Sequence, residues 1–229
     1  MLIKADFFQT IIEHLFRDKA IVYIYDRIAC KEYESLIDEI VSFAKIEQYP
    51  NFIQVSGIPG AGKSTFCKRY YPNATLVQFD TIMAKIPQYQ KDCERLGLIQ
   101  SFSKWEMPAR VIGYEVIHRL IEKKASFVLE HSGMNPAHIK LIEVLKKQAY
   151  HTQMQFLYCE LDEACQRAKK REKIILRHTP EELIKERFNA SLEYLDIYKT
   201  KIDEVCIWDL TNSENWTIKE RWQGGVLLK

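Results

Sequence analysis

A glycine-rich stretch at residues 57–65, GIPGAGKST, has the residue types and spacing needed to hold a chain of phosphates. It fits the pattern G-x-x-x-x-G-K-S, in which the glycines let the backbone curl so that successive N–H groups point at phosphate oxygens. In that pattern Lys63 reaches the β- and γ-phosphates, and the hydroxyl of Ser64 ligates Mg²⁺. The sequence therefore predicts a nucleoside triphosphate site made of Gly57, Ile58, Pro59, Gly60, Ala61, Gly62, Lys63, Ser64 and Thr65.

The segments on either side of this loop have the character that it requires. Residues 52–56, FIQVS, are typical of a buried strand, and an amphipathic run follows the loop. A phosphate-binding loop joins such a strand to such a helix, whose N-terminus adds partial positive charge. This context distinguishes a nucleotide site from an ordinary glycine-rich turn, but it does not specify the reaction.

Polar side chains end two further strand-like runs. Asp80 ends ATLVQFD, where its carboxylate could accept the proton of an attacking hydroxyl, bind Mg²⁺ through water, or cap the next helix. Our choice for Asp80 is the catalytic base. Glu130 follows the apolar run SFVL, and we expect it to bind substrate hydroxyls together with Ser132; a carboxylate at the start of a helix is the alternative. We expect His131, between them, to be structural.

A basic segment, CQRAKKREKIILRHTPEE, occupies residues 165–182. Such charge runs usually form a solvated helix face. After the fourth predicted strand, however, arginines from a flap could stabilise the charge that develops on a transferred phosphoryl group. We select Arg171 and Arg177 for that role. The first strand–helix unit lacks an Asp-Glu pair at the end of an apolar strand, which favours a kinase over a hydrolytic ATPase.

Helical patterns alternate with strand-like runs, which lie within residues 52–56, 74–80, 125–133, 152–161 and 205–210. This alternation predicts an α/β fold of the P-loop NTPase type, with a parallel sheet of about five strands flanked by helices. In such sheets ligands bind beyond the carboxyl ends of the strands, and the candidate residues converge there.

The pattern also predicts where the chain divides. Residues 1–49 have apolar residues at helical spacing, and we expect a helical N-terminal extension followed by a kinase domain at residues 50–229. We expect a helix break at Met107 and Pro108, and a capping box in which Thr179 and Glu182 start a later helix.

Composition limits the class of protein. The 229 residues carry a formal net charge of +2 and are 47% hydrophobic, which indicates a folded core and disfavours extended nucleic-acid binding. The six cysteines form no C-x-x-C pair, which is typical of free thiols in a reducing compartment. With no signal-peptide pattern and no apolar run long enough for a membrane span, we expect a cytoplasmic protein without membrane contact.

These residues together resemble the zeta-toxin-like P-loop kinases and, more distantly, the phage-type polynucleotide kinases. The resemblance covers most of residues 50–200 and depends on four motifs in order: GIPGAGKST, FDTIMAKIPQY, YEVIHRLIEKKASFVLEHSG and REKIILRHTPEELI. It implies ATP- or GTP-dependent phosphorylation of a small substrate's hydroxyl, which in zeta toxins belongs to a UDP-N-acetyl amino sugar. It further implies Mg²⁺ as cofactor, Asp80 as base and Glu130 near the substrate sugar. An antitoxin protein as partner is consistent with the same resemblance.

The sequence departs from this family at one motif. The family's E-G-T-x-R reads here Glu130, His131, Ser132, Gly133 and Met134, so a hydroxyl is kept and a guanidinium is lost. That difference leaves the kinase interpretation intact and leaves the UDP-sugar open. Two alternatives remain: a polynucleotide 5′-hydroxyl kinase, which the near-neutral charge disfavours, and a nucleotide-binding regulatory module without turnover.

Overall fold

A computed structural model describes residues 33–134, 136–175 and 179–228. Its centre is one seven-stranded sheet with the strand order β2-β3-β1-β4-β5-β6-β7. Strands β1 to β5 are parallel, whereas β6 and β7 add to the edge in antiparallel fashion. The strands are β1 (Asn51–Ser56), β2 (Leu76–Gln78), β3 (Phe127–Glu130), β4 (His151–Tyr158), β5 (Glu204–Asp209), β6 (Thr217–Gln223) and β7 (Val226–Leu227).

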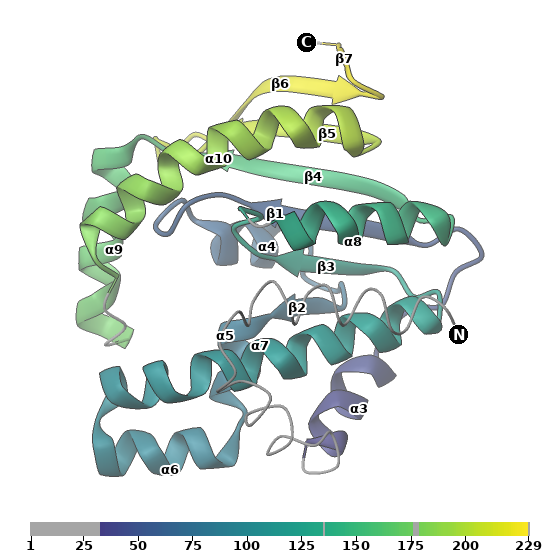
Figure 1. Cartoon of the computed structure of the whole chain (residues 1–229). Helices are drawn as coiled ribbons and strands as arrows, with labels where there is room; N and C mark the ends of the chain where they lie inside the picture. Colours follow the sequence, from purple (N-terminus) through teal and green to yellow (C-terminus); the bar gives the residue numbers. More distant parts are fainter. Residues whose placement is uncertain (1–32, 135, 176–178, 229) are drawn as a thin grey trace.

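Helices cover both faces of this sheet, as Figure 1 shows. The helices of the described residues are α3 (Glu34–Ser42), α4 (Lys63–Tyr70), α5 (Phe79–Ala84), α6 (Pro87–Leu96), α7 (Leu98–Glu122), α8 (Pro136–Lys147), α9 (Leu161–Ile175) and α10 (Glu181–Lys201). The predicted fold class, a P-loop-type parallel sheet flanked by helices, is confirmed.

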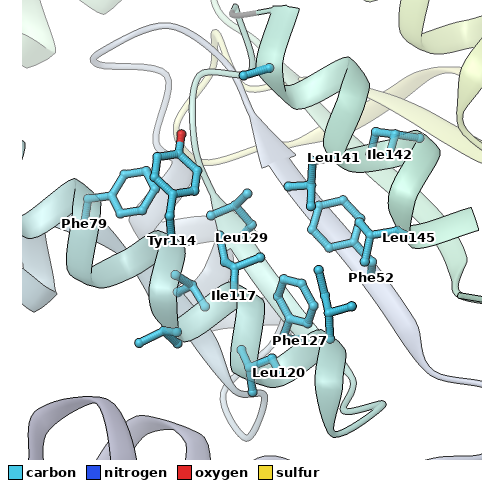
Figure 2. Close-up of a cluster of buried hydrophobic side chains, with 14 of the residues drawn as sticks. Phe52, Phe79, Tyr114, Ile117, Leu120, Phe127, Leu129, Leu141, Ile142 and Leu145 are labelled. Carbon is cyan, nitrogen blue, oxygen red and sulfur yellow. The ribbon is translucent and has the colours of Figure 1, made fainter. Parts of the chain in front are cut away.

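Two hydrophobic clusters, one on each face, explain why the central strands are almost continuously apolar. On one face Phe52, Phe127 and Leu129 pack against α7 and α8, and Figure 2 shows these side chains interleaved with Leu141 and Leu145. On the other face α4 and α9 pack against alternate residues of the same strands. Parallel strands buried on both sides need apolar residues at every position, whereas a half-exposed strand needs them at every second one.

Three sequence predictions about individual elements differ from the structure. Pro108 lies inside α7 without ending it, although proline removes one backbone hydrogen bond there. Helix α10 has Pro180 at its N-cap and no side-chain cap bond, so the capping box was wrong. Strands β6 and β7 were not expected, because TIKERWQ is rich in charged residues that are uncommon in strands.

Of the predicted N-terminal extension, the described part contains α3 and a short non-helical link. Residues 1–32 lie outside the described residues, and the domain boundary at residue 49 stays a prediction. Five cysteines are described, all as free thiols, and Cys30 lies outside. None of the helices among the described residues is long and apolar enough to cross a membrane.

The close approach of α7 to α5 generates a test of the fold. A Cβ added to Gly113 of α7 would lie 2.4 Å from two ring atoms of Phe79, the buried first residue of α5. Alanine usually stabilises a helix interior by about 1 kcal/mol relative to glycine. Here we expect Gly113→Ala to lower the free energy of unfolding by about 1–2 kcal/mol, because overpacking outweighs that gain. Urea denaturation measures the change.

The matched control for this prediction is a double variant. Adding Phe79→Leu to Gly113→Ala removes the ring atoms that clash, so it should recover part of the lost stability. A Gly113→Ala protein as stable as the wild type would show that α5 and α7 do not pack this closely.

Candidate active site

The phosphate loop runs from the end of β1 to the start of α4, at the carboxyl edge of the sheet (Figure 1). Gly60 and Gly62 have φ angles of 88° and 95°, in the region that favours glycine. At Gly60 a Cβ would also lie 2.2 Å from the carbonyl oxygen of Ala164, the fourth residue of α9. The loop therefore passes so close to α9 that only glycine fits, and the following helix begins at Lys63.

The Lys63 side chain folds back over this loop. Its ammonium group donates hydrogen bonds to the carbonyl oxygens of Gly57 at 2.8 Å and Ile58 at 3.0 Å. Burial lowers the pKa of Lys63 to about 8; the carboxylate of Glu130 opposes that shift, and Arg171 and Arg187 add to it. The ammonium thus lies among several charged groups at the position where a phosphate chain would bind.

The carboxylate of Glu130, at the end of β3, joins the end of β2 to the start of α4. The hydroxyl of Ser64 donates to Glu130 Oε1 at 2.8 Å, and the side-chain amide of Gln78, at the end of β2, donates to Oε2. Thr81 in turn donates to the amide oxygen of Gln78 at 3.1 Å. Glu130 therefore lies beside Ser64, the predicted Mg²⁺ ligand, as well as at the wall expected to hold the substrate.

Asp80 lies in the first turn of α5 and lines the same cavity as Lys63. It does not cap that helix, because Gln78 holds the N-cap position and no side chain makes a cap hydrogen bond there. Its negative charge also acts on Lys63, in the direction that raises the lysine's pKa. The helix-cap alternative is removed, and the alternatives of base and water-mediated metal ligand remain.

The cavity at the strand ends has a volume of about 820 Å³, including its open mouth. It brings together seven of the fourteen site residues predicted from the sequence, which are Pro59, Lys63, Ser64, Asp80, Glu130, Ser132 and Arg171. Arg171 extends from α9, as expected for a flap arginine. Arg177, the other predicted arginine, lies outside the described residues.

Sequence reasoning missed Arg187, which lines the cavity from α10 and lowers the pKa of Lys63 by its charge. A signal was present in the sequence. The buried residues of α10 include Ile184, Ser191 and Leu195, so position 187 falls on the inward stripe of that helix, three residues after Ile184. An arginine on an inward stripe is unusual unless it serves a site.

Helix α7 adds a second pair that the sequence analysis did not select. Glu106 and Arg110 line the cavity one turn apart, with a 2.8 Å ion pair between them. Arg110 lies close enough to His131 and His138 for its charge to contribute to lowering the pKa of both histidines. Four cations of the described residues therefore line this cavity, which are Lys63, Arg110, Arg171 and Arg187.

The oxygen atoms beside the loop fit Mg²⁺. The cation prefers hard oxygen ligands and usually keeps several waters, so it binds through one or two protein groups plus phosphates. Ser64 and Glu130 supply a hydroxyl and a carboxylate 2.8 Å apart. The described residues contain no cluster of three His, Cys, Asp or Glu side chains that could hold a metal without a nucleotide.

The parallel sheet, the phosphate loop and the charged cavity at the strand ends define a P-loop nucleotide-binding protein of the kinase-like class. A protein-family profile described as Zeta toxin matches residues 36–220, which is most of the chain. The protein therefore belongs to the zeta toxin family.

Solved structures show the same fold at low sequence identity. A structure from the PezAT toxin–antitoxin system of Streptococcus pneumoniae has a TM-score of 0.68 and 14% identity, covering 83% of this chain and 79% of that chain. The AvrRxo1-ORF1:-ORF2 structure with ATP has a TM-score of 0.67 and 13% identity, covering 86% and 68%. The Pnkp1/Rnl/Hen1 RNA repair complex gives 0.51 and 14%, covering 67% and 47%. No curated protein matches the sequence.

The lowered pKa of Lys63 predicts how nucleotide binding depends on pH. A polyanion binds the charged ammonium, and above about pH 8 the free protein increasingly carries a neutral amine. Affinity for Mg·ATP should therefore fall about tenfold between about pH 7 and pH 9. Isothermal titration calorimetry measures this fall. The control is Lys63→Arg, which stays charged and should show a flat profile; a flat profile for the wild type would contradict the lowered pKa.

Proposed function

We propose that the protein is a kinase that transfers the γ-phosphate of ATP or GTP to a hydroxyl of a small acceptor. The observation that carries this proposal is the cavity itself. The carboxylate of Asp80 lines it together with Lys63, Arg171 and Arg187, and the charges of the other three residues act on Lys63. A base, a phosphate cradle and cations for the transferred group are the parts that phosphoryl transfer requires.

In this reaction the acceptor oxygen attacks the γ-phosphorus, the bond from that phosphorus to the β–γ bridging oxygen breaks, and ADP or GDP leaves. Asp80 accepts the proton of the attacking hydroxyl. Lys63, Arg171 and Arg187 stabilise the negative charge on the transferred group. Ser64 and Glu130 would hold Mg²⁺, which neutralises charge on the β- and γ-phosphate oxygens when bound. Glu130 and Ser132 would also bind acceptor hydroxyls.

For the acceptor, we propose a UDP-N-acetyl amino sugar as the first candidate, supported by membership of the zeta toxin family. A 5′-hydroxyl polynucleotide is the second candidate, and the fold shared with the Pnkp1 complex keeps it open.

Two further proposals concern the setting of the reaction. An antitoxin protein is a proposed partner, supported by the structural likeness to a chain of the PezAT toxin–antitoxin system. We place the protein in the cytoplasm, since its five described cysteines are free thiols.

The proposed function is tested by the fate of labelled γ-phosphate. Wild-type protein with Mg²⁺ and labelled ATP or GTP is incubated with UDP-N-acetylglucosamine or with a 5′-hydroxyl oligonucleotide. Label on the sugar nucleotide supports the first acceptor, and label on the oligonucleotide alone supports the second. Tight ATP binding without release of ADP, with either acceptor or with a cell extract, would support a regulatory module and refute the kinase.

Removing the base gives the first prediction for this mechanism. Asp80→Asn keeps the shape of the side chain but cannot take a proton at neutral pH. We expect turnover to fall by about 10²- to 10⁴-fold, while the Kd for ATP stays nearly unchanged. Steady-state kinetics and calorimetry on the same preparation measure both quantities. Equal turnover in the variant and the wild type would reject Asp80 as the base.

Removing an arginine gives the second prediction. Arg187→Ala should lower turnover by about 10²- to 10³-fold, since it removes one cation from the developing charge. Lys185→Ala is the matched control, because Lys185 is exposed on the same helix, does not line the cavity and pairs with Glu181 at 2.9 Å. If Arg177→Ala abolishes turnover while Arg187→Ala does not, the sequence-based choice of Arg177 was right and Arg187 is structural.

A further inference from the structure

His131 lies in the cavity wall between Glu130 and Ser132, and its ring is clamped from two sides. The ring of His138, in α8, stacks on it with centroids 4.1 Å apart and planes 10° from parallel. The ring of Phe79, in α5, meets it edge-on with centroids 5.5 Å apart. Two different helices therefore hold the imidazole in one orientation.

The hydrogen bonds of this ring define where its proton lies. His131 Nδ1 accepts a hydrogen bond from the backbone N–H of Gly133 at 3.0 Å. Because Nδ1 accepts this bond, it carries no proton, and the imidazole is in its neutral form. A neutral imidazole with an accepting Nδ1 carries its proton on Nε2.

The structure around His131 leaves this Nε2–H available to a ligand. None of the described residues accepts a hydrogen bond from Nε2, and His131 is partly exposed where it lines the cavity. The stack behind it is closed, since His138 is fully buried and its Nε2 lies 3.1 Å from the hydroxyl of Tyr114. The donor thus belongs to a residue that lines the same cavity as Glu130 and Ser132.

The backbone around this donor is fixed as well. The hydroxyl of Tyr198 donates to the carbonyl oxygen of Gly133, and that of Ser56 donates to the carbonyl oxygen of Ser132, both at 2.5 Å. Gly133 has a φ of 77°, and a Cβ there would lie 2.5 Å from the amide nitrogen of Gln54. A donor held on such a rigid turn can select among ligands, because a poorly matched ligand cannot move it.

We propose that His131 is a specificity-determining residue, whose Nε2–H binds an uncharged oxygen of the acceptor beside the hydroxyl that receives the phosphate. A neutral N–H suits a hydroxyl or an amide carbonyl, whereas an anionic group would be better served by a cation. The acceptor is thus a polyhydroxylated or amide-bearing alcohol, such as a sugar. This inference rests on the proposed kinase function and replaces the structural role expected for His131 from the sequence.

Three substitutions separate the contributions of this side chain. His131→Gln can place an amide N–H at about the position of Nε2, so it keeps the proposed donor. His131→Asn can place an amide oxygen at about the position of Nδ1, so it keeps only the bond from Gly133. His131→Phe keeps only the stacked ring. Melting temperatures of all three show whether each variant is folded.

The first readout compares the KM for the acceptor with the KM for ATP in each variant. The acceptors are UDP-N-acetylglucosamine, a 5′-hydroxyl oligonucleotide and the low-mass fraction of a cell extract. We expect the acceptor KM to rise about 5- to 10-fold in the Phe and Asn variants and to stay near wild type in the Gln variant, with the KM for ATP unchanged in all three. A Phe variant equal to wild type, rescue by Asn alone, or an equal rise in both KM values would overturn the inference.

The second readout does not depend on turnover. In ¹⁵N-histidine NMR of the full chain with Mg²⁺ and a non-hydrolysable ATP analogue, the Nε2–H signal of His131 should shift when one of the same acceptors is added. If no acceptor receives phosphate but the signal shifts, the kinase proposal fails and the ligand contact stands. If no acceptor shifts the signal, the inference about His131 is overturned whether or not phosphate is transferred.

Discussion

The hydrogen bonds of one carboxylate, that of Glu130, determine how the rest of the site is arranged. One oxygen accepts from Ser64 of the phosphate loop and the other from Gln78 at the end of β2. Strand β3, which carries Glu130, lies between β1 and β2 in the sheet, so the carboxylate bridges both neighbours at once. Partial burial of a carboxylate is unfavourable in free energy unless its oxygens are hydrogen-bonded. These hydrogen bonds offset that desolvation penalty and hold β3, the end of β2 and the start of α4 in register.

The two sides of the sheet contribute differently to this arrangement. On the α4 and α9 side, the phosphate loop is pressed against Ala164, and Arg171 reaches the cavity from the same helix. On the α7 and α8 side, Phe79 and His138 pack around the turn that follows β3. Elements on both sides of the sheet therefore contribute side chains to one cavity.

The sequence was sufficient for the parts of the protein that depend on local chemistry. The phosphate loop has a fixed spacing, and the five parallel strands are largely apolar, so both were predicted. Asp80, Glu130 and Ser132 were expected at one edge because the carboxyl ends of parallel strands meet there, and all three line the cavity, while their roles stay predictions. Arg187 was missed because its role depends on the rotation of α10, and Arg110 because its place depends on how α7 packs. His131 was judged structural, since the sequence does not show that its Nδ1 accepts a hydrogen bond from the backbone of Gly133.

The measurement that tests the central claim most directly is a single-turnover experiment with γ-labelled ATP, Mg²⁺ and the low-mass metabolites of a cell. The claim is that the strand ends form a site that moves phosphate to an organic hydroxyl. It predicts that label passes from ATP into a phosphate ester and that little appears as inorganic phosphate. Label that remains in ATP, or that appears only as inorganic phosphate, would contradict it.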